Sequence, residues 1–241
     1  MTTYVLVHGA WHTGAEFEPV AQAIRAEGHI VHCPTIAGNR PGDSKRVGLD
    51  EAIASIVDYL ADNGLSDVVL LGHSYGGMII TGVADRVPQR IRRLIYWNAF
   101  VPNDGEALND LVPAHYVALF DAVSQASPDN SVVLPFPIWR EGFINDADLA
   151  TAQAAYDVLN PHPYATFTDQ IRLSKNPGEM ELAKSYLYCT EDCALPQSLG
   201  WHPRLSEKLG LFRFVAIPGS HELCFTDPAA LAAGIIKAGR D

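Results

Sequence analysis

Short apolar runs and longer amphipathic stretches alternate along this chain. The runs are apolar over most of their length, which is typical of strands covered on both faces of a sheet: 4–8, 29–33, 67–71 and 92–99. Helices are predicted over 15–27 and 49–63, because apolar residues recur every three or four positions and a glycine follows each stretch. Another short helix is predicted over 78–84, before Pro88.

The same alternation returns toward the end of the chain. Strands are predicted over 184–189 and 211–217, and helices over 196–209 and 227–238. Strands that alternate with helices form a parallel sheet, because each crossover through a helix returns the chain in the same direction. The sequence therefore predicts an α/β fold with about six parallel strands and helices on both faces.

Residues 103–178 interrupt this pattern. They contain no clean strand, and they combine recurrent prolines with scattered large apolar side chains; only 146–159 has a convincing helical pattern. A compact domain seldom holds so long a loop without structure of its own. We therefore predict a small helical cap over 103–178, inserted into an α/β core formed by 1–102 and 179–241.

Composition and charge exclude some classes of function. The 241 residues suffice for one large domain with a sizeable core, and 48% of them are hydrophobic. The formal net charge of −11 argues against nucleic acid or an anionic membrane surface as a partner, because both select basic patches. The chain shows no leader pattern and no apolar run near the roughly 20 residues that span a bilayer, so we expect a cytoplasmic protein.

The four cysteines predict neither a disulfide framework nor a metal site. Only Cys189 and Cys193 lie close together in sequence, and no second pair completes a set of ligands. We therefore expect reduced, partly buried thiols.

The segment 71–77, LGHSYGG, carries the strongest chemical signal in the chain. It places Ser74 between glycines, after a predicted strand and before a predicted helix. This is the pattern of a nucleophile elbow, in which a strained turn exposes the serine hydroxyl and the glycines let other backbone approach closely. Ser74 is therefore the candidate nucleophile.

A serine nucleophile needs a base within hydrogen-bond distance and an acid that orients the base. In this architecture the acid and then the histidine follow the serine in sequence, each after a strand. Asp192 follows the predicted strand 184–189, and His221 follows the last one. We expect these two residues in the two roles, with Glu191 and Asp104 as alternative acids.

Three other histidines lie near predicted site loops. His73 adjoins the serine, and we interpret it as a packing or supporting residue because neighbours at such a turn point in different directions. His8 and His12 have a spacing that suits a metal, but no acidic or cysteine companions are nearby in sequence. We interpret them as structural or pocket-lining groups.

Acyl transfer also requires backbone N–H groups that stabilise the negative charge on the attacked carbonyl. One should come from Tyr75, directly after the serine. The other should come from the loop after the first strand, where Ala10 is the best candidate and Gly9 allows close approach. In a doubly wound sheet the strand order reverses between the first and third strands, so both loops should open into the same crevice.

Taken together, these motifs resemble the α/β-hydrolase superfamily. Within it, the chain is similar to the group of methylesterases and hydroxynitrile lyases that includes the plant salicylate-binding methylesterase and polyneuridine aldehyde esterase. The segments that carry the likeness are 5–10, 71–78, 98–102, 184–192 and 219–221, with 143–163 in the predicted cap. The resemblance implies a triad of Ser74, His221 and Asp192, an oxyanion hole from Ala10 and Tyr75, and no metal or organic cofactor. It also suggests a homodimer.

Two positions separate this chain from the lyases of that group. The lyases resemble the esterases but carry threonine where this chain has Gly9, and lysine where it has Glu222. An acidic side chain cannot offer a positive charge to a departing cyanide, so hydroxynitrile cleavage is not expected. We expect Glu222 to cap the turn that follows; alternatively, it repels anionic substrates or contacts a cationic group.

We therefore predict a serine hydrolase that cleaves a small, apolar or aromatic carboxylic ester, such as a methyl ester or lactone, through an acyl-enzyme. Side chains proposed to wall its pocket are Trp11, Phe120, Phe136 and Trp139, together with Gly9. Two alternatives stay open: a C–C lyase or cofactor-independent oxygenase that uses the His221 and Asp192 base, or a non-catalytic receptor for a small molecule.

Overall fold

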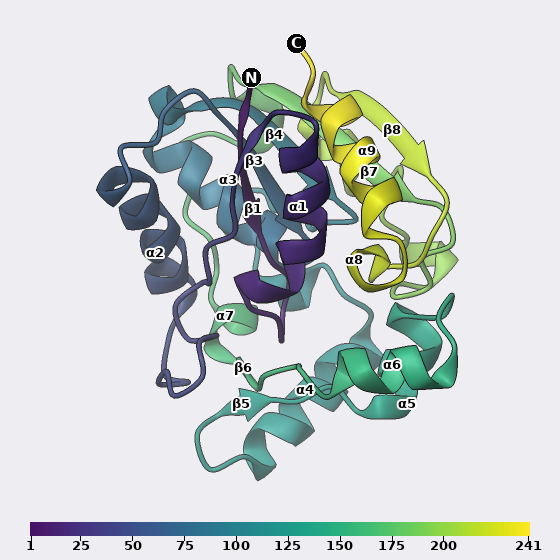
Figure 1. The fold of residues 1–241 in the computed structure, drawn as a ribbon. Helices are drawn as coiled ribbons and strands as arrows, with labels where there is room; N and C mark the ends of the chain where they lie inside the picture. The colour runs from purple at the N-terminus through teal and green to yellow at the C-terminus, as the bar shows by residue number, and fades with distance from the viewer.

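A six-stranded parallel sheet runs through the centre of the molecule (Figure 1). The structure is a computed structural model and describes residues 1–241. Every neighbouring pair of strands is parallel, so the predicted α/β sheet is confirmed. In their order across the sheet, the strands are β2 (Ile30–His32), β1 (Thr3–Val7), β3 (Val68–His73), β4 (Ile91–Trp97), β7 (Ala183–Cys189) and β8 (Arg213–Ile217).

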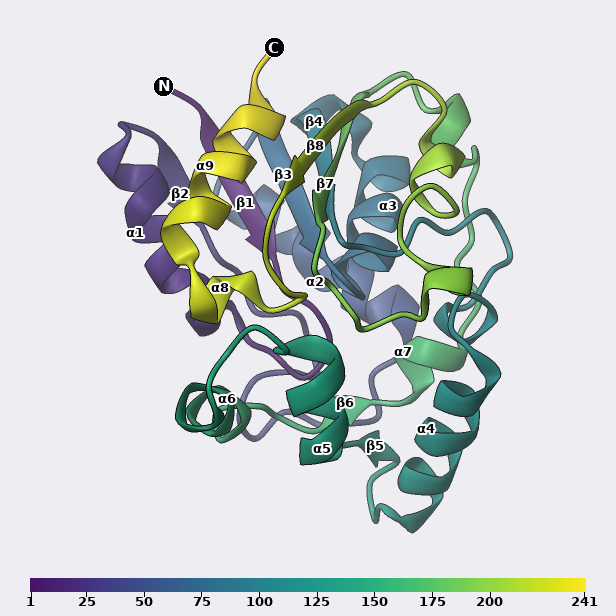
Figure 2. The same ribbon diagram turned by 90° about the vertical axis from the view of Figure 1, so that its right-hand side faces the viewer.

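Helices cover both faces of this sheet (Figure 2). One face carries α1 (Glu18–Ala26) and α9 (Pro228–Gly239), which contact each other, and the opposite face carries α2 (Leu49–Asp62) and α3 (Gly76–Arg86). The chain enters α1 through the short helix η1 (Gly14–Phe17), whose first turn is closed by a capping box between Thr13 and Glu16. In α1 and α2 the buried residues form one apolar stripe, as the spacing predicted, whereas residues 76–84 of α3 are buried on all sides.

Strand residues supply the centre of the core. All six residues of β3 are buried, and so are residues 4–7 of β1. A fully buried Val, Leu or Ile side chain stabilises a fold by about 1.5–3 kcal/mol. The continuous apolar runs that identified these strands are therefore also the main source of the sheet's stability.

The order in which successive strands are added to the sheet reverses at β1. The helix after β1 lies on one face of the sheet and the helix after β3 lies on the other, although the two strands are neighbours. Val7 lies level with Gly72 across this pair. The loops that begin at His8 and Ser74 therefore open side by side at the carboxyl edge of the sheet, as expected for a doubly wound fold.

Most of segment 103–178 lies across that carboxyl edge, at the bottom of Figure 1, and after Thr168 the chain runs back toward the start of β7. A two-stranded antiparallel sheet pairs β5 with β6 within this segment, where no strand was expected. In chain order, the elements of segment 103–178 up to Thr168 are η3 (Leu108–Asp110), α4 (Ala114–Ala126), β5 (Ser131–Val132), α5 (Phe136–Ile138), a π-helical turn (Trp139–Phe143), α6 (Leu149–Tyr156), β6 (His162–Pro163) and α7 (Ala165–Thr168). The division into core and cap at 102 and 178 stays a prediction.

The helix predicted over 196–209 is wrong. The structure has only two 3₁₀ turns there, η6 (Gln197–Leu199) and η7 (Ser206–Leu209). Between them lie Gly200, which favours helix little, and Pro203, which has no N–H and disfavours the helical conformation at the residue before it. The other short helices are η2 (Pro88–Arg90), η5 (Pro177–Glu179) and α8 (Leu223–Thr226).

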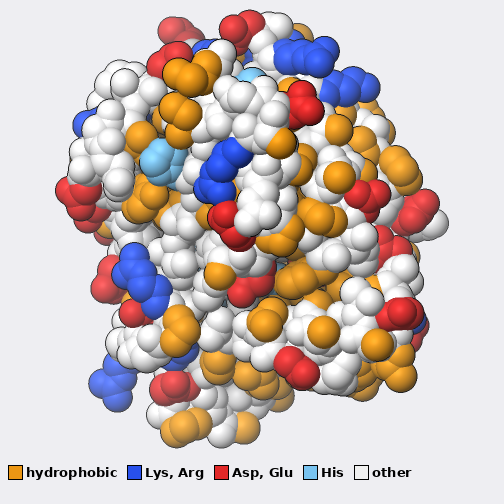
Figure 3. Space-filling model, viewed as in Figure 1, with side chains coloured by type: hydrophobic (Ala, Val, Ile, Leu, Met, Phe, Trp, Pro, Cys, Tyr) orange, Lys and Arg blue, Asp and Glu red, His pale blue; other side chains and the backbone are white.

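The surface agrees with the charge of the sequence. On the face seen in Figure 3, lysine and arginine side chains form small separate groups with acidic side chains between them. None of the helices combines the length and the apolar character that crossing a membrane requires. The four cysteines are free thiols.

Candidate active site

Ser74 occupies a strained turn between β3 and α3. Its φ of 53° lies in the left-handed region that residues with a side chain seldom adopt. The helix starts two residues later at Gly76, where a Cβ atom would lie 2.8 Å from the carbonyl oxygens of Val7 and His8. A glycine at this position thus allows α3 to begin against the end of β1, which positions the Ser74 hydroxyl at the carboxyl edge of the sheet.

His221 and Asp192 approach each other from the loops after the last two strands of the sheet. The His221 Nδ1 atom lies 2.6 Å from Asp192 Oδ2, and both side chains are almost fully buried. Because a carboxylate only accepts hydrogen bonds, Nδ1 carries the hydrogen and Nε2 keeps a free lone pair. No hydrogen bond joins Ser74 to His221 in this structure; such bonds are often long in enzymes without substrate.

Aromatic rings enclose the His221 imidazole. The Trp201 ring stacks on it with centroids 5.1 Å apart, and the Phe143 ring meets it edge-on at 5.2 Å. Burial alone would lower the pKa of His221, but the charge and hydrogen bond of Asp192, with a smaller contribution from Glu222, raise it above its usual 6.5.

Asn98 is a part of this site that the sequence reasoning missed. Its side-chain amide donates to Asp192 Oδ2, and its Oδ1 accepts the Cys189 N–H at 2.7 Å. The Ala194 N–H donates to the other oxygen of Asp192 at 2.8 Å. Asn98 directly follows β4, between the serine strand and the acid strand, and a buried polar residue at that position is the signal that could have identified it.

The alternative acids lie elsewhere. Glu191 is exposed, and its only bonds are made by its backbone. Asp104 is also exposed and accepts the Leu173 N–H at 2.9 Å. Of the three candidates, Asp192 alone contacts His221.

His8 and His73 support the loops around Ser74. The His8 ring donates from Nδ1 to Gly9 O at 2.8 Å and accepts the Ile36 N–H at Nε2 at 3.0 Å, and burial lowers its pKa to about 3. The His73 ring stacks on Trp97 at 3.9 Å and bonds the His221 carbonyl oxygen from Nε2 at 3.0 Å. Burial keeps the pKa of His73 well below its usual value, so both rings are neutral supports.

Glu222 does not cap the turn after it, which corrects the expectation from sequence. It occupies the N-cap position of α8, but its side chain makes no capping hydrogen bond. Instead, Oε1 lies 3.3 Å from His12 Nε2, with both side chains almost fully buried. The alternative that Glu222 contacts a cationic group describes its surroundings better: the group is His12, whose pKa Glu222 raises above its usual value despite burial.

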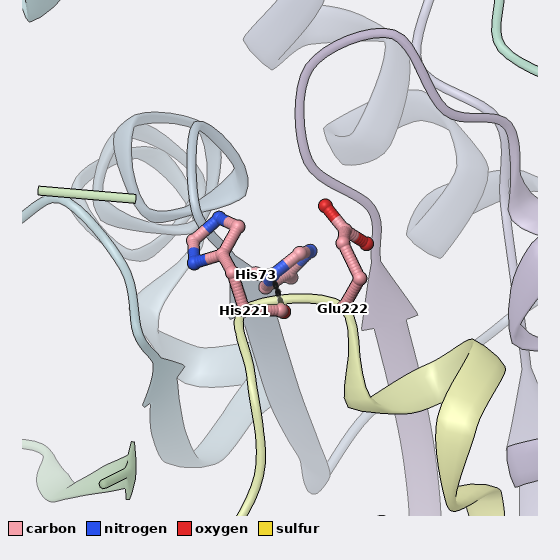
Figure 4. Close-up of side chains that lie close together, drawn as sticks. All are labelled: His73, His221 and Glu222. Carbon is pink, nitrogen blue, oxygen red and sulfur yellow. Dashed lines mark hydrogen bonds between the residues drawn. The ribbon is translucent and has the colours of Figure 1, made fainter. Parts of the chain in front are cut away.

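Three buried groups in this region lie close enough to share an ion. One ligand atom from each of His73, His221 and Glu222 lies within 4.8 Å of the others. In Figure 4 the His221 ring and the Glu222 carboxylate leave the backbone on different sides, with His73 between them. Each group already has a hydrogen-bond partner within the chain, although the buried Nδ1 of His73 has none. The absence of a metal in the reaction stays a prediction.

The two candidate oxyanion amides are free to bind a ligand. Neither the Ala10 N–H nor the Tyr75 N–H donates a hydrogen bond in the loops and turns of the protein. Both residues are buried, and both line the same cavity as Ser74. Buried backbone N–H groups without a partner are rare, so this pair is a strong indication of an anion or oxyanion site.

The cavity above Ser74 is narrow and apolar. Its free volume is only about 30 Å³, and it is lined by 14 residues, of which 13 are hydrophobic. Trp11 and Phe120 line it as proposed. Gly9, Phe136 and Trp139 do not: Trp139 is fully buried and donates from Nε1 to Ala152 O, and Phe136 packs on Tyr156. The sequence reasoning did not assign the other lining residues Phe100, Leu108, Val112, Tyr116, Phe143, Phe167, Ala194, Leu195 and Trp201.

A comparison with known protein families identifies the family of this chain. The family model described as "Alpha/beta hydrolase family" matches residues 4–234. The chain belongs to the alpha/beta hydrolase family. The predicted superfamily is thereby confirmed, together with the fold class of a parallel sheet flanked by helices.

Relatives of this alpha/beta hydrolase match it along its length. The carbendazim hydrolyzing esterase of Nocardioides sp. is 33% identical, over 99% of this chain and 100% of that protein. Salicylic acid-binding protein 2 of Nicotiana tabacum is 24% identical, over 97% of this chain and 95% of that protein. The solved structure of an extracellular alpha/beta-hydrolase from a Paenibacillus species superimposes with a TM-score of 0.97 at 40% identity, covering 100% of both chains.

The surroundings of His221 predict where activity is lost in acid. His221 accepts a proton only in its neutral form, so kcat/KM should rise with pH through the pKa of His221. Because Asp192 raises that pKa, we expect the midpoint of the acid limb above 6.5. A pH profile of kcat/KM with a neutral ester checks this, and a midpoint below 6.5 would contradict the assigned environment.

Asn98 should contribute both stability and activity. In Asn98→Ala, Asp192 loses a buried donor and Cys189 N–H loses its acceptor, so we expect unfolding to become easier by about 1–3 kcal/mol. We also expect a lower kcat, because Asp192 is held less firmly. Urea unfolding and ester kinetics measure the two effects; unchanged stability and kcat would show that the Asn98 bonds are unimportant.

Proposed function

We propose that this alpha/beta hydrolase cleaves small apolar carboxylic esters by acyl transfer through Ser74. The observation that carries the proposal is the meeting of three features at one apolar cavity: the Ser74 elbow, the His221 and Asp192 pair, and the free amides of Ala10 and Tyr75. An acyl-transfer site requires a nucleophile, an oriented base and donors for the oxyanion.

In this proposal the chemistry follows from the tautomer of His221. Its Nε2 lone pair takes the proton of the Ser74 hydroxyl as the oxygen attacks the ester carbonyl, and the Ala10 and Tyr75 amides bind the developing oxyanion. The proton then passes to the leaving alcohol. Water repeats the cycle on the acyl-enzyme, which frees the acid and restores Ser74.

The relatives support this class of reaction. The Nocardioides and Sphingobium relatives are named as a carbendazim hydrolyzing esterase and a pyrethroid hydrolase, and both match nearly all of this chain. The predicted class, a carboxylic ester hydrolase, is confirmed at this level. The natural ester and the roles of individual residues are our proposal, and so are a cytoplasmic location and a homodimer; one structural neighbour is described as extracellular.

The cavity favours a small substrate with an apolar or aromatic part. Ser74 is the one residue outside the 13 hydrophobic residues of its lining, so a charged group in the cavity would lose its hydration without compensation. Segment 103–178 contributes part of the wall, including Tyr116, Phe120 and Phe143. We therefore propose that this segment acts as a cap that sets which esters fit.

Gly9 argues against the hydroxynitrile lyase alternative. A Cβ atom at this position would lie 3.1 Å from His73 Nδ1 and 3.2 Å from Ser74 Cβ, both closer than ordinary contact. The threonine of the lyases would therefore crowd the serine here. Glu222 also places a carboxylate where the lyases have a lysine, which agrees with an esterase.

Replacing the nucleophile tests the proposed function. With p-nitrophenyl acetate, the wild-type protein should release a burst of p-nitrophenol followed by steady turnover. Ser74→Ala should abolish the burst and lower kcat by at least about 10³-fold without a change in thermal unfolding, because the other groups bind ester but cannot form the acyl-enzyme.

The outcomes separate the alternatives. Turnover that persists in Ser74→Ala would favour chemistry by His221 and Asp192 alone, as in a C–C lyase or a cofactor-independent oxygenase. Tight binding of small esters by folded wild-type protein with negligible turnover would favour a receptor.

Trp11 separates the cavity from a second hollow. The second one, with a free volume of about 100 Å³, is lined by Trp11 together with Val133, Leu134, Tyr156, Leu159 and Asn160. The Trp11 ring is fixed by its Nε1 bond to Val132 O at 3.0 Å, and its backbone oxygen accepts the Asn160 N–H at 2.7 Å. In the proposed esterase this ring would therefore limit the length of the acyl chain.

Removing the Trp11 ring should join the two hollows. We expect Trp11→Ala to raise the ratio of kcat/KM for p-nitrophenyl octanoate to that for p-nitrophenyl acetate by about tenfold or more, since each buried methylene contributes substantially to discrimination. Phe120→Ala is the matched control, because Phe120 lines the first cavity but not the second. An equal rise in both variants would show that Trp11 is not the divider.

A further inference from the structure

A second buried acid and histidine pair lies beside the first one. His12 Nε2 and Glu222 Oε1 are 3.3 Å apart, and their side chains are 4% and 2% exposed. Cys224 donates weakly from its thiol to the other carboxylate oxygen, at 3.8 Å. The rings of Trp139 and Phe225 flank His12, each with its centroid 5.9 Å away. Neither His12 nor Glu222 has a part in the proposed acyl transfer.

The pair joins the two loops that the proposed reaction must hold in register. His12 lies two residues after Ala10, whose amide is a candidate oxyanion donor. Glu222 directly follows His221. The His12 backbone is fixed by a bond from Asn39 Nδ2 to its oxygen at 3.1 Å, and the Glu222 N–H donates to Phe143 O at 3.2 Å. The side-chain contact is therefore a direct link between two anchored loops.

The pair also carries charge in a dry environment. Burial alone would lower the pKa of His12, but Glu222 raises it above the usual value, which favours a protonated histidine beside a carboxylate. The other titratable groups that face the pair are few and come from several elements: Glu16 of η1, His8 after β1, His73 of β3, Cys224 of α8, His162 of β6 and His221 itself. Only Glu16 among them adds negative charge near His12.

We infer that His12 and Glu222 are positioning residues for the esterase proposed above, holding the Ala10 loop against the His221 loop and placing a negative charge near the base. The inference rests on the proposed function for its kinetic consequences. It also assigns the two partners opposite influences on His221, because one carries negative and the other positive charge.

Because Glu222 and His12 have opposite effects on His221, replacing each one tests the inference. Glu222 raises the pKa of His221 and protonated His12 lowers it, with the larger effect from Glu222. In Glu222→Gln the buried His12 loses its carboxylate partner and stays neutral, so the acid limb of kcat/KM should move to lower pH. In His12→Asn the carboxylate keeps its charge without its partner, so the limb should move to higher pH.

Kinetics separate positioning from simple packing. We expect kcat to fall about tenfold in Glu222→Gln with KM little changed, because the oxyanion donors and the base lose their register. Glu141→Gln is the matched control: Glu141 is an exposed carboxylate on the π-helical turn that ends at Phe143, the residue packed on His221. Its acid limb and kcat should stay those of the wild type.

Two measurements keep the inference testable if a variant misfolds or if the proposed function fails. If His12→Asn does not fold, the Glu222→Gln shift still decides, since the amide is nearly isosteric and thermal unfolding reports its integrity. If turnover proves independent of Ser74, the proposed function fails, but NMR titration of His221 in the Ser74→Ala background still reads the effect of each substitution. Shifts in opposite directions support the inference. An unshifted limb in Glu222→Gln, or shifts in the same direction, would overturn it.

Discussion

The left-handed backbone at Ser74 is the constraint on which the rest of this structure depends. A residue with a side chain in that region costs about 1–3 kcal/mol, so the surrounding fold must hold it in place. The sheet does this by placing the end of β1 against the start of α3, where Gly76 leaves room for the carbonyl oxygens of Val7 and His8. The same contact brings the Ala10 and Tyr75 loops together, so the candidate nucleophile and the two free amides are positioned by one part of the fold.

A buried polar network accompanies this strain. The Asp192 carboxylate is fully buried, and it has three hydrogen-bond partners: His221, Asn98 and the Ala194 N–H. A buried carboxylate with fewer partners would be destabilising, because its lost hydration would not be repaid. Glu222 meets the same requirement through a histidine from the opposite loop. Polar groups in this site are thus held in fixed positions by the bonds that make their burial tolerable.

Much of the fold and of the candidate site could be predicted because the signals are local. Continuous apolar runs marked the strands, and the spacing of glycines around Ser74 marked the elbow before any contact was known. Chain order was enough to select Asp192 and His221, since loops after parallel strands meet at one edge of the sheet. Predictions failed where the outcome depends on partners distant in sequence. Phe136 and Trp139 looked like pocket residues, but they pack within segment 103–178. The stretch 196–209 failed for a local reason instead, since Pro203 should have counted against a helix.

The sequence by itself determined the class of fold, the candidate nucleophile and the order of the residues that surround it, because strand periodicity and turn chemistry are properties of neighbouring residues. Only the tertiary structure decided what each buried polar group faces. Nothing in the chain order links Asn98 to Asp192, or His12 to Glu222, since their partners are about a hundred residues or more away along the chain. A polar group in a packed interior needs a hydrogen-bond partner. Which residue becomes that partner depends on how the fold arranges the loops in space.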